Sequence, residues 1–465
     1  MTAPVIVWFR RDLRISDQPA LAAAVASGAP VIPVYILDDD TPKHRKMGAA
    51  SRWWLHHSLT ALDADLQKLG SKLLLRAGKS DAVLEALAAE TNASAIHCIR
   101  HYEPWWRNAE KAVASRLHKD TALICHDGNY LLPAGSVTTG SGGQYKIYTP
   151  FMRALWQQMP PPVPHPAPTK IAAPDNWPDS DSLSAWNLLP TKPNWSGAMD
   201  EMWTPGEVGA KNRLSTFVDK AKFYDEKRNL PSVEGSSFLS AHLHFGEISP
   251  AACWHATMDQ GGSVDVFLKE LVWRDYAQNI IVQMPEYGAK NAREAFDIFP
   301  WRDLSDPAVQ ADFVAWTKGR TGYPIVDAGM RQLWATGWMH NRVRMIAASF
   351  LIKHLLIDWR EGEKWFWDTL VDADYGSNSV NWQWTAGTGV DSNMFVRIMA
   401  PLSQSEKFDA ARYIREWVPE LAALQEPYIH DPDEYGARPK DYPRKIIGHK
   451  AARERALHAH AVVKG

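Results

Sequence analysis

The segment TGYPIVDAGMRQLWATGWMHNRVRMIAASFLIKHLLIDWREGEKWFWDTLVDADYGSNSVNWQW, residues 321–384, decides how the second half of this chain folds. Its apolar residues recur at the spacing of one face of a core-facing helix. The positions that fit this stripe are Val343, Ile346, Ala347, Phe350 and Leu351. From Asn212 onward strand patterns are absent and helical periodicity takes over. The second half is therefore predicted to be all helical.

The first 130 residues follow a different pattern, in which short β-branched runs alternate with helical segments. That alternation predicts βαβ units and a parallel sheet covered by helices on both faces. The predicted strands are residues 5–9, 31–37, 72–77, 95–100 and 122–127, with helices at 21–27, 51–69 and 80–92. No G-x-G-x-x-G motif follows the first strand, so the domain is Rossmann-like without the dinucleotide-binding fingerprint.

The fold class expected is thus α/β plus all-α, with three segments along the chain. An α/β domain spans residues 1–130, a linker spans 131–211, and a helical domain spans 212–465. The linker is proline-rich over 157–211, and ten of the 31 prolines fall between Pro160 and Pro193. Such a stretch is typical of an extended connection.

Composition limits the class of protein without naming it. The 45% hydrophobic content supports large buried cores, and 22 Trp residues are most simply read as core packing. The net charge of −2 neither supports nor excludes a nucleic-acid partner, because a local basic groove can hide in a neutral total. No targeting sequence and no membrane-length apolar run is seen, so we expect a soluble, cytoplasmic monomer with no membrane partner.

The three cysteines, Cys98, Cys125 and Cys253, are far apart in the sequence. They form no CxxC and no Cys/His metal pattern, which suits a reducing cytosol. No metal site is expected.

The segment 321–384, centred on Trp338-Met339-His340-Asn341-Arg342, closely resembles the photolyase/cryptochrome family. Within it, the segment is most similar to bacterial class I cyclobutane pyrimidine dimer photolyases. The resemblance runs from Val5 to about Gly448 and is weakest between residues 157 and 215. It implies an N-terminal antenna domain and a helical FAD-binding domain. It also implies light-dependent DNA repair, in which photoexcited reduced FAD gives an electron to a pyrimidine dimer that is flipped out of the duplex.

The flavin site is expected first in FYDEKRNLPSVEGSSFLS, residues 223–240. Hydroxyls and backbone N–H groups after Gly235 suit a pyrophosphate, although such a turn alone is more often only a helix cap. Asp372 and Asp374 alone would equally suit a helix cap, whereas a metal loop lacks further oxygen ligands. The resemblance implies non-covalent FAD binding by Tyr224, Ser236, Ser237, Phe238, Leu239, Ser240, Arg274, Asn341, Arg344, Asp372, Ala373, Asp374 and Asn378.

The lesion pocket is expected on the segment FLKELVWRDYAQNI, where Glu270, Trp273 and Arg274 share one helical face. An amphipathic helix with a Glu–Arg pair would show the same spacing. The resemblance gives Glu270 a hydrogen bond to the dimer and Trp273 a wall of its pocket. The residues that it implies for binding dimer-containing DNA are Arg228, Glu270, Trp273, Asn341, Arg342, Met345, Trp384, Arg397, Gln404 and Lys407.

The catalytic residues implied are Glu270, Asn341, Asn378 and an electron relay of three tryptophans. In the relay, Trp382 and Trp359 match the family's motifs closely, in NWQW and IDWREG. Trp301 is the expected third member. The interval between Trp301 and Trp316 is longer than in the family pattern, so Trp316 is the alternative candidate for the terminal electron donor of the relay.

The second chromophore stays open. Trp105 and Trp106 stand where folate-binding members carry Asn-Glu, which argues against methenyltetrahydrofolate, and a deazaflavin, an FMN or no antenna all fit. A cryptochrome is the main alternative function. Asn378, where plant cryptochromes have Asp, and a short C-terminal tail argue against it. A (6-4) photolyase would carry a His pair at Met339-His340-Asn341. A Rossmann-like nucleotidyl module would bind no flavin.

Overall fold

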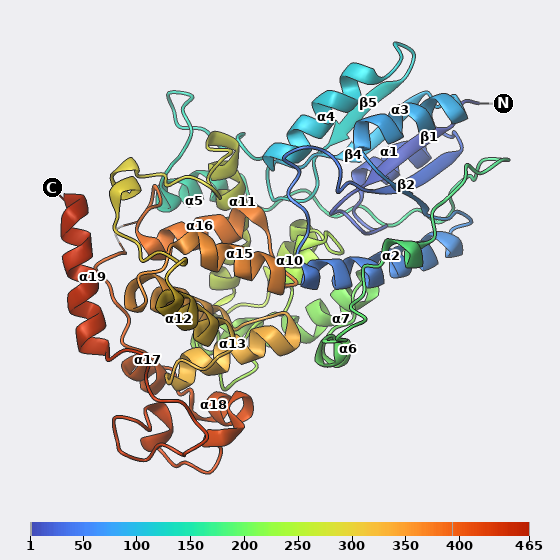
Figure 1. Ribbon diagram of the computed structural model, residues 1–465. Helices are drawn as coiled ribbons and strands as arrows, with labels where there is room; N and C mark the ends of the chain where they lie inside the picture. The colour runs from blue at the N-terminus through green and yellow to red at the C-terminus, as the bar shows by residue number, and fades with distance from the viewer. Residues whose placement is uncertain (1, 393, 465) are drawn as a thin grey trace. The chain divides into compact units, whose positions relative to one another are not determined.

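The computed structural model describes residues 2–392 and 394–464 of the chain. The chain, drawn as a ribbon in Figure 1, divides into two compact units, and each consists of several stretches of the sequence. The first comprises Met1–Asn194, Trp203–Ala221 and Ser237–Pro285, and the second comprises Trp195–Met202, Lys222–Ser236 and Glu286–Gly465. Helical residues 237–285 therefore group with the α/β residues. The domain boundaries expected at residues 130 and 211 stay a prediction.

The first unit is built on a five-stranded parallel sheet with the strand order β3-β2-β1-β4-β5. Its strands are β1 (Val5–Phe9), β2 (Val31–Leu37), β3 (Leu74–Ala77), β4 (Ala95–Ile99) and β5 (Ala122–His126). Val5 in the central strand pairs with Val31 on one side and with Ala95 on the other. All of β1 is buried, as expected for an apolar run in a sheet covered on both faces. The predicted parallel sheet is confirmed.

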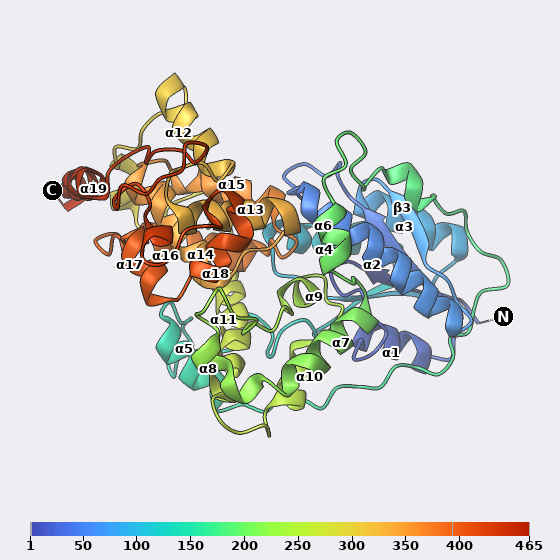
Figure 2. The ribbon, with the colours of Figure 1, turned by 90° about the horizontal axis from the view of Figure 1, so that it is seen from below.

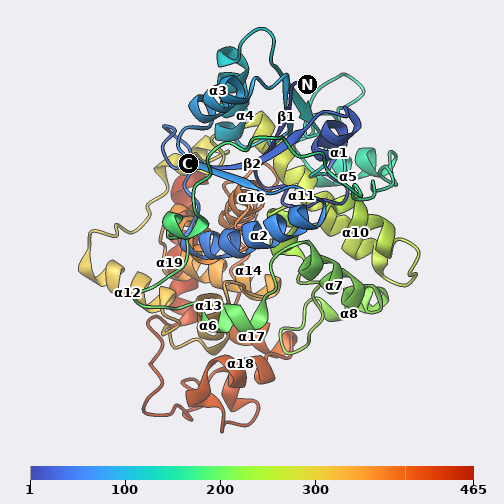
Figure 3. The same cartoon turned by 90° about the vertical axis from the view of Figure 1, so that its right-hand side faces the viewer.

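Helices of the first unit fill the crossovers and continue beyond the sheet. They are α1 (Pro19–Ala26), α2 (Ala49–Lys68), α3 (Ser80–Thr91), α4 (Pro104–Arg116), α5 (Tyr148–Trp156), η1 (Leu183–Trp186), α7 (Glu207–Val218), α9 (Ser240–His244), α10 (Pro250–Thr257) and α11 (Val264–Gln283). Helix α1 packs on β1 and β4, whereas α3 and α4 pack on each other. Because crossovers are right-handed, the reversal of direction after β3 places α3 and α4 on the face opposite α1. Helix α10 packs on α7 and α11, as Figure 3 shows.

The second unit is helical throughout its described residues, which confirms the predicted helical half. Its elements are α6 (Gly197–Met202), α8 (Tyr224–Lys227), η3 (Glu294–Ile298), α12 (Pro307–Thr317), α13 (Pro324–Thr336), α14 (Asn341–Ser349), η4 (Phe350–His354), α15 (Trp359–Thr369), α16 (Tyr375–Ala386), α17 (Pro401–Lys407), α18 (Ala411–Trp417), η5 (Pro419–Leu421), η6 (Tyr428–His430) and α19 (His449–Lys464). A short 3-10 turn, η2 (Ala221–Phe223), joins the stretches of the two units. Figure 2 shows α13, α14, α15 and α16 gathered around one core.

Local signals in the sequence explain where these central helices begin and end. Helix α13 starts with Pro324 and ends at Gly337, whose φ of 68° suits glycine. Helix α15 is capped by Asp358, whose side chain accepts a hydrogen bond from the Arg360 backbone N–H. The predicted stripe Val343, Ile346 and Ala347 is buried in this core. In the described part of the chain, no helix combines the length and apolarity needed to cross a bilayer.

Helices α15 and α16 approach each other closely at Gly362. A Cβ atom at this position would overlap the Trp382 ring and would lie 2.6 Å from Leu351 Cδ2. Only the absence of a side chain lets the two helices pack at this separation.

Gly362→Ala should therefore destabilise the protein, because the added methyl group overpacks the core against a rigid indole. We expect the free energy of unfolding to fall by about 1–3 kcal/mol, measured by chemical denaturation. Gly140→Ala is the matched control, since a Cβ there would meet nothing within 4 Å. Equal stability of the two variants would contradict the close approach.

Candidate functional site

The start of helix α14 carries several of the predicted site residues. His340 caps this helix, and its Nδ1 accepts a hydrogen bond from the Arg342 backbone N–H at 3.2 Å. Burial, together with the positive charges of Arg342, Arg344 and Arg228, lowers the pKa of His340 to about 4. His340 is therefore neutral at physiological pH, and it presents the first turn of α14 in a fixed orientation.

Arg344 and Asp372 form a two-pronged ion pair. The Arg344 Nη1 and Nη2 atoms lie 3.0 and 2.9 Å from the two Asp372 carboxylate oxygens, and the Asp372 side chain is almost fully buried. Arg344 Nε donates a further hydrogen bond of 2.7 Å to the Met339 carbonyl. Bidentate pairs of this kind fix both position and orientation. Both residues of the pair belong to the set expected to bind the flavin.

The segment after Asp372 begins helix α16. Asp374 caps the helix by accepting a 2.7 Å hydrogen bond from the Ser377 backbone N–H. Of Asp372 and Asp374, which the sequence alone suggested as helix-capping residues, Asp374 does cap a helix. One turn later, the buried Asn378 amide donates to the carbonyl and to the Oε1 atom of Glu363, at 3.1 and 2.9 Å. Glu363 was not predicted; it holds the amide of Asn378 in place.

A cavity of about 390 Å³ opens in the helical unit. Its lining comes from three segments of the chain and comprises Arg342, Met345, Trp384, Met394, Arg397, Ile398, Met399, Ala400, Ser403 and Gln404. Five of these, Arg342, Met345, Trp384, Arg397 and Gln404, are residues predicted to bind DNA or the lesion. The volume falls within the roughly 300–1,000 Å³ of small-molecule sites. The cavity combines an apolar floor with cationic and amide groups.

The wall of this cavity is held by a buried lysine that the sequence did not point to. Lys353 lies in the π-helical turn η4, and its Nζ donates to the carbonyls of Met394 and Arg397 at 2.8 and 2.9 Å. Burial lowers the pKa of Lys353 to about 7. The lysine therefore anchors the stretch that carries Arg397. Among the other predicted DNA residues of this unit, Asn341 and Lys407 are exposed and lie outside the cavity lining.

Arg342 is held against neighbouring side chains of the same unit. Its Nη2 donates to Asn229 Oδ1 at 2.6 Å, and its guanidinium lies 4.5 Å from the centre of the Phe408 ring. Tyr224 begins α8, and the Arg228 guanidinium lies 5.4 Å from the centre of its ring. The predicted basic residues near the lesion pocket are thus held in place by packing and hydrogen bonds.

The predicted serine turn, residues 236–240, leads directly into α9. Ser237 Oγ accepts a 3.3 Å hydrogen bond from the Leu239 backbone N–H, and Phe238 has a φ of 54°. Leu239 is buried, whereas the three serines are at least partly exposed. Gly235 approaches the Lys227 backbone so closely that a Cβ would lie 2.5 Å from its carbonyl oxygen. Glycine is required where the turn begins.

Helix α11 carries Glu270, Trp273 and Arg274, as predicted. Trp273 is 37% exposed and stacks flat on Tyr148, with ring centres 3.4 Å apart. Arg274 Nη2 donates to the Leu243 carbonyl at 3.1 Å. Its Nη1 is buried and has no hydrogen-bond partner among the described residues. An exposed aromatic face and an unsatisfied buried donor are features of a ligand site.

The four candidate relay tryptophans differ in burial. Trp359, Trp382 and Trp316 are buried, whereas Trp301 is partly exposed. The rings of Trp316 and Trp382 meet edge to face with centres 6.4 Å apart, and Trp359 Nε1 donates to Asn291 Oδ1 at 2.9 Å. A backbone hydrogen bond connects the segments that carry Trp301 and Trp359. The N–H of Arg302, next to Trp301, donates to the carbonyl of Leu356, which is three residues before Trp359. The structure thus brings each candidate into one core.

In the α/β unit, Trp105 and Trp106 of α4 are buried. The His44 ring lies 6.1 and 4.6 Å from their respective ring centres, and Trp106 also packs on Trp8 at 6.2 Å. His244 Nδ1 is 3.3 Å from Arg11 Nη1. These contacts leave the identity of a second chromophore open.

Two residues of the helical unit suit the predicted flavin. Arg344, oriented by Asp372, offers a fixed cation, and Asn378 offers a neutral amide held by Glu363. Carbonyl and phosphate oxygens are the groups that such donors bind. The set contains no ligand arrangement typical of a divalent metal.

Comparisons with known proteins identify the family of this chain. Residues 5–169 match the family described as DNA photolyase, and residues 267–461 match the FAD binding domain of DNA photolyase. A protein of Agrobacterium fabrum named deoxyribodipyrimidine photo-lyase is 49% identical, over 100% of this chain and 98% of the relative. Among solved structures, a bacterial class III photolyase from Agrobacterium tumefaciens has a TM-score of 0.93 and 48% identity, covering 100% of this chain and 98% of that one. A Synechocystis cryptochrome has a TM-score of 0.86 and 28% identity, covering 98% and 99%. The chain therefore belongs to the photolyase/cryptochrome family, as an enzyme of the deoxyribodipyrimidine photo-lyase type.

Proposed function

We propose that this protein repairs cyclobutane pyrimidine dimers in DNA under blue light, with reduced FAD bound without a covalent link. The observation that carries the proposal is the cavity of about 390 Å³, which five residues predicted to bind the damaged DNA line together. They come from separate helices and loops, so their common position does not follow from closeness in the sequence. A flipped-out dimer needs such an apolar recess beside cationic groups.

The seat for the dimer is proposed from the shape and chemistry of the cavity. Trp384 and Met345 offer apolar surfaces to the pyrimidine rings, and Trp273 is proposed as a further aromatic wall. Glu270 would hydrogen-bond the dimer, and such a bond gains strength as negative charge develops on the pyrimidines. Flipping is least costly at a damaged, poorly stacked site, which favours the lesion over intact DNA.

The flavin-binding set expected from the sequence is retained as a proposal. When bound, reduced FAD would supply the electron that splits the dimer. Arg344, Asp372 and Asp374 would hold the cofactor beside the neutral amide of Asn378, and Asn341 would lie near both cofactor and dimer. A neutral amide tolerates an anionic neighbour, whereas an aspartate at the same position would repel it. The serine turn, with Tyr224, Phe238 and Leu239, and the adjoining Ala373 complete the proposed set.

The finer class and the cellular setting are also proposals. Class I is supported by the sequence motifs, while the similar Agrobacterium tumefaciens structure is described as class III. Cytoplasmic location and a monomeric state are likewise proposed. The cryptochrome resemblance keeps a photoreceptor function as the second candidate. The antenna chromophore stays undetermined.

The test is repair of an oligonucleotide that contains one thymine dimer. Purified protein, chemically reduced, should remove the dimer under blue light and leave it intact in the dark, as measured by chromatography of the strand. Heat-released supernatant of the same preparation should contain FAD.

Two outcomes would contradict the proposal. Repair of a (6-4) photoproduct in place of the dimer would make the protein a (6-4) photolyase. A flavin that responds to light without repair of either lesion would favour the cryptochrome function.

Binding to dimer-containing DNA should weaken steeply with salt, because Arg228, Arg342, Arg397 and Lys407 are proposed to neutralise phosphates. Arg397→Gln should reduce the slope of log affinity against log salt by about one, measured by fluorescence anisotropy. Arg412→Gln removes an exposed arginine that is outside the cavity lining, so it should leave the slope unchanged. Equal slopes for the two variants would remove Arg397 from the phosphate contacts.

The tryptophans are proposed to pass electrons inward from the protein surface, in the order Trp301, Trp359 and Trp382. The outermost tryptophan of the relay, here called the exit residue, is left oxidised when it gives up its electron. It must regain an electron from a donor in solution, so its side chain must be exposed to solvent. Trp301 is partly exposed, whereas Trp316 is completely buried and uses its N–H on the Ala347 carbonyl at 3.0 Å. This difference supports Trp301 over Trp316 as the exit.

Trp359→Phe should block photoreduction of oxidised FAD, because phenylalanine is far harder to oxidise than tryptophan. The absorbance of the flavin under blue light and an external donor measures this directly. The same variant, reduced chemically, should repair dimers at nearly the parent rate, since the lesion pocket is unchanged. Trp301→Phe should impair photoreduction and Trp316→Phe should do so much less. The reverse result would make Trp316 the exit, and normal photoreduction by Trp359→Phe would refute the relay.

A further inference from the structure

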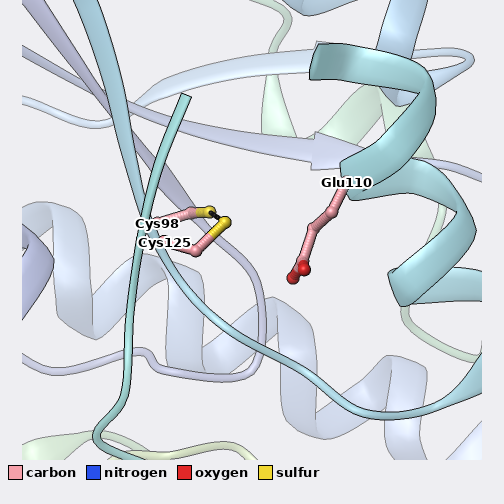
Figure 4. Close-up of side chains that lie close together, drawn as sticks. All are labelled: Cys98, Glu110 and Cys125. Atoms are coloured by element: carbon pink, nitrogen blue, oxygen red, sulfur yellow. Dashed lines mark hydrogen bonds between the residues drawn. The ribbon is translucent and has the colours of Figure 1, made fainter. Parts of the chain in front are cut away.

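Two cysteines that are far apart in the sequence meet in the α/β unit. Cys98 and Cys125 occupy paired positions of the neighbouring parallel strands β4 and β5. Their Sγ atoms are 3.6 Å apart, and Figure 4 shows the two sulfurs facing each other with Glu110 of α4 beside them. Nothing in the proposed repair chemistry uses this pair.

The two thiols differ in exposure. Cys98 is completely buried, whereas Cys125 is partly exposed. Strand β5 lies at the edge of the sheet and is itself partly exposed along its length. Cys125 is therefore the more accessible residue of the pair.

Charges around the pair distinguish the two sulfurs further. The hydrogen bond between Cys98 and Cys125, together with the nearby Arg10 and Arg100, lowers the pKa of Cys125 below its ordinary value. The same bond and burial raise the pKa of Cys98. Glu110 works against the Arg10 effect, but it is already paired with Arg10 at 2.9 Å. Cys125 is therefore the thiol of the pair that loses its proton more readily.

We propose that Cys98 and Cys125 form a reversible disulfide, in which a hydroperoxide oxidises Cys125 and Cys98 resolves the product. The Cys125 thiolate attacks one peroxide oxygen, the O–O bond breaks, and a sulfenic acid and hydroxide form. The Cys98 sulfur then attacks the Cys125 sulfur. The S–S bond forms as the S–O bond breaks, and the leaving hydroxide takes the Cys98 proton as water. With hydrogen peroxide, two thiols are oxidised, the peroxide is reduced, and two waters are released. An external dithiol reverses the change.

The backbone geometry permits this bond. Adjacent strands are about 4.7–4.9 Å apart, and disulfides span Cα separations of about 4.4–6.8 Å. The sulfurs, now 3.6 Å apart, would have to approach to the roughly 2.05 Å of an S–S bond. The bond would tie β5 to β4 at the carboxyl edge of the sheet.

The same residues, Cys98, Cys125 and Glu110, also form a three-ligand cluster that a metal ion could occupy. A dication is the weaker interpretation, because Arg10 already neutralises Glu110 and lies next to the sulfurs. Structural zinc sites usually have four protein ligands, and this cluster supplies three among the described residues. The dithiol is therefore favoured, and metal binding becomes an outcome of the test.

The experiment treats the full-length purified protein with hydrogen peroxide, blocks the remaining thiols with N-ethylmaleimide, and maps the peptides by mass spectrometry. We expect one cross-link between the Cys98 and Cys125 peptides, loss of two reactive thiols, and recovery of both with dithiothreitol. Absence of the cross-link, or a cross-link that involves Cys253, would overturn the proposal.

Three variants assign the roles. Cys98→Ser should accumulate a sulfenic acid on Cys125 that dimedone traps, whereas Cys125→Ser should give neither the cross-link nor the trapped product. Cys253→Ser is the matched control, since Cys253 is also buried and should leave the cross-link intact. Dimedone labelling of Cys98 in Cys125→Ser would reverse the roles and refute the order. Should a substitution prevent folding, the peptide map of the parent protein still decides. The reduced parent protein is also tested for binding of one equivalent of Zn²⁺. If it binds the ion and both Cys98→Ser and Cys125→Ser fail to bind it, the pair is a metal site and the disulfide proposal is wrong.

Discussion

The ion pair of Arg344 with Asp372 is the interaction on which the candidate site of the helical unit depends. A carboxylate as buried as Asp372 is stable only with a partner, and the two-pronged geometry leaves that partner one orientation. Because Arg344 also binds the Met339 carbonyl, the pair joins the start of α14 to the turn before α16. The residues from Asn341 to Met345 belong to the first of these two segments, and those from Asp374 to Asn378 directly follow the second. The cavity residues and the proposed flavin residues thus share one rigid support.

Other buried polar groups extend this support by binding backbone carbonyls and a side-chain amide. Lys353 holds the carbonyls on both sides of the stretch that carries Arg397, and Glu363 fixes the amide of Asn378. Each places a polar group in the core, where it costs free energy unless it is paired. Since the pairing partners are loop and side-chain groups near the cavity, the cost is offset only in one arrangement. Such pairing makes the site preorganised for a ligand.

The sequence predicted the elements better than their tertiary partners. The strands β1 and β2 begin and end where predicted, because β-branched runs between turn residues depend on local chemistry. Five of the ten residues that line the cavity were named from family motifs. Lys353 and Glu363 were missed, since a lysine within an apolar stripe and a glutamate on a helix give no local signal of their burial. The contact between Cys98 and Cys125 was also missed. Each cysteine is the last residue but one of its strand, β4 or β5, and these two strands are parallel neighbours. Aligning the strand ends could have found that pair.

Exposure then assigns different roles to residues of the same chemical type. Trp301 and Trp316 have the same indole, but an oxidised indole that is fully buried cannot take an electron from a donor in solution. Cys98 and Cys125 have the same thiol, but only Cys125, on the edge strand, is partly exposed. In the proposed relay and the proposed disulfide the buried member keeps a role, one in the packed core and the other as the resolving thiol. Sequence motifs identify the residue types, whereas the direction in which electrons move follows from burial, which only the folded chain defines.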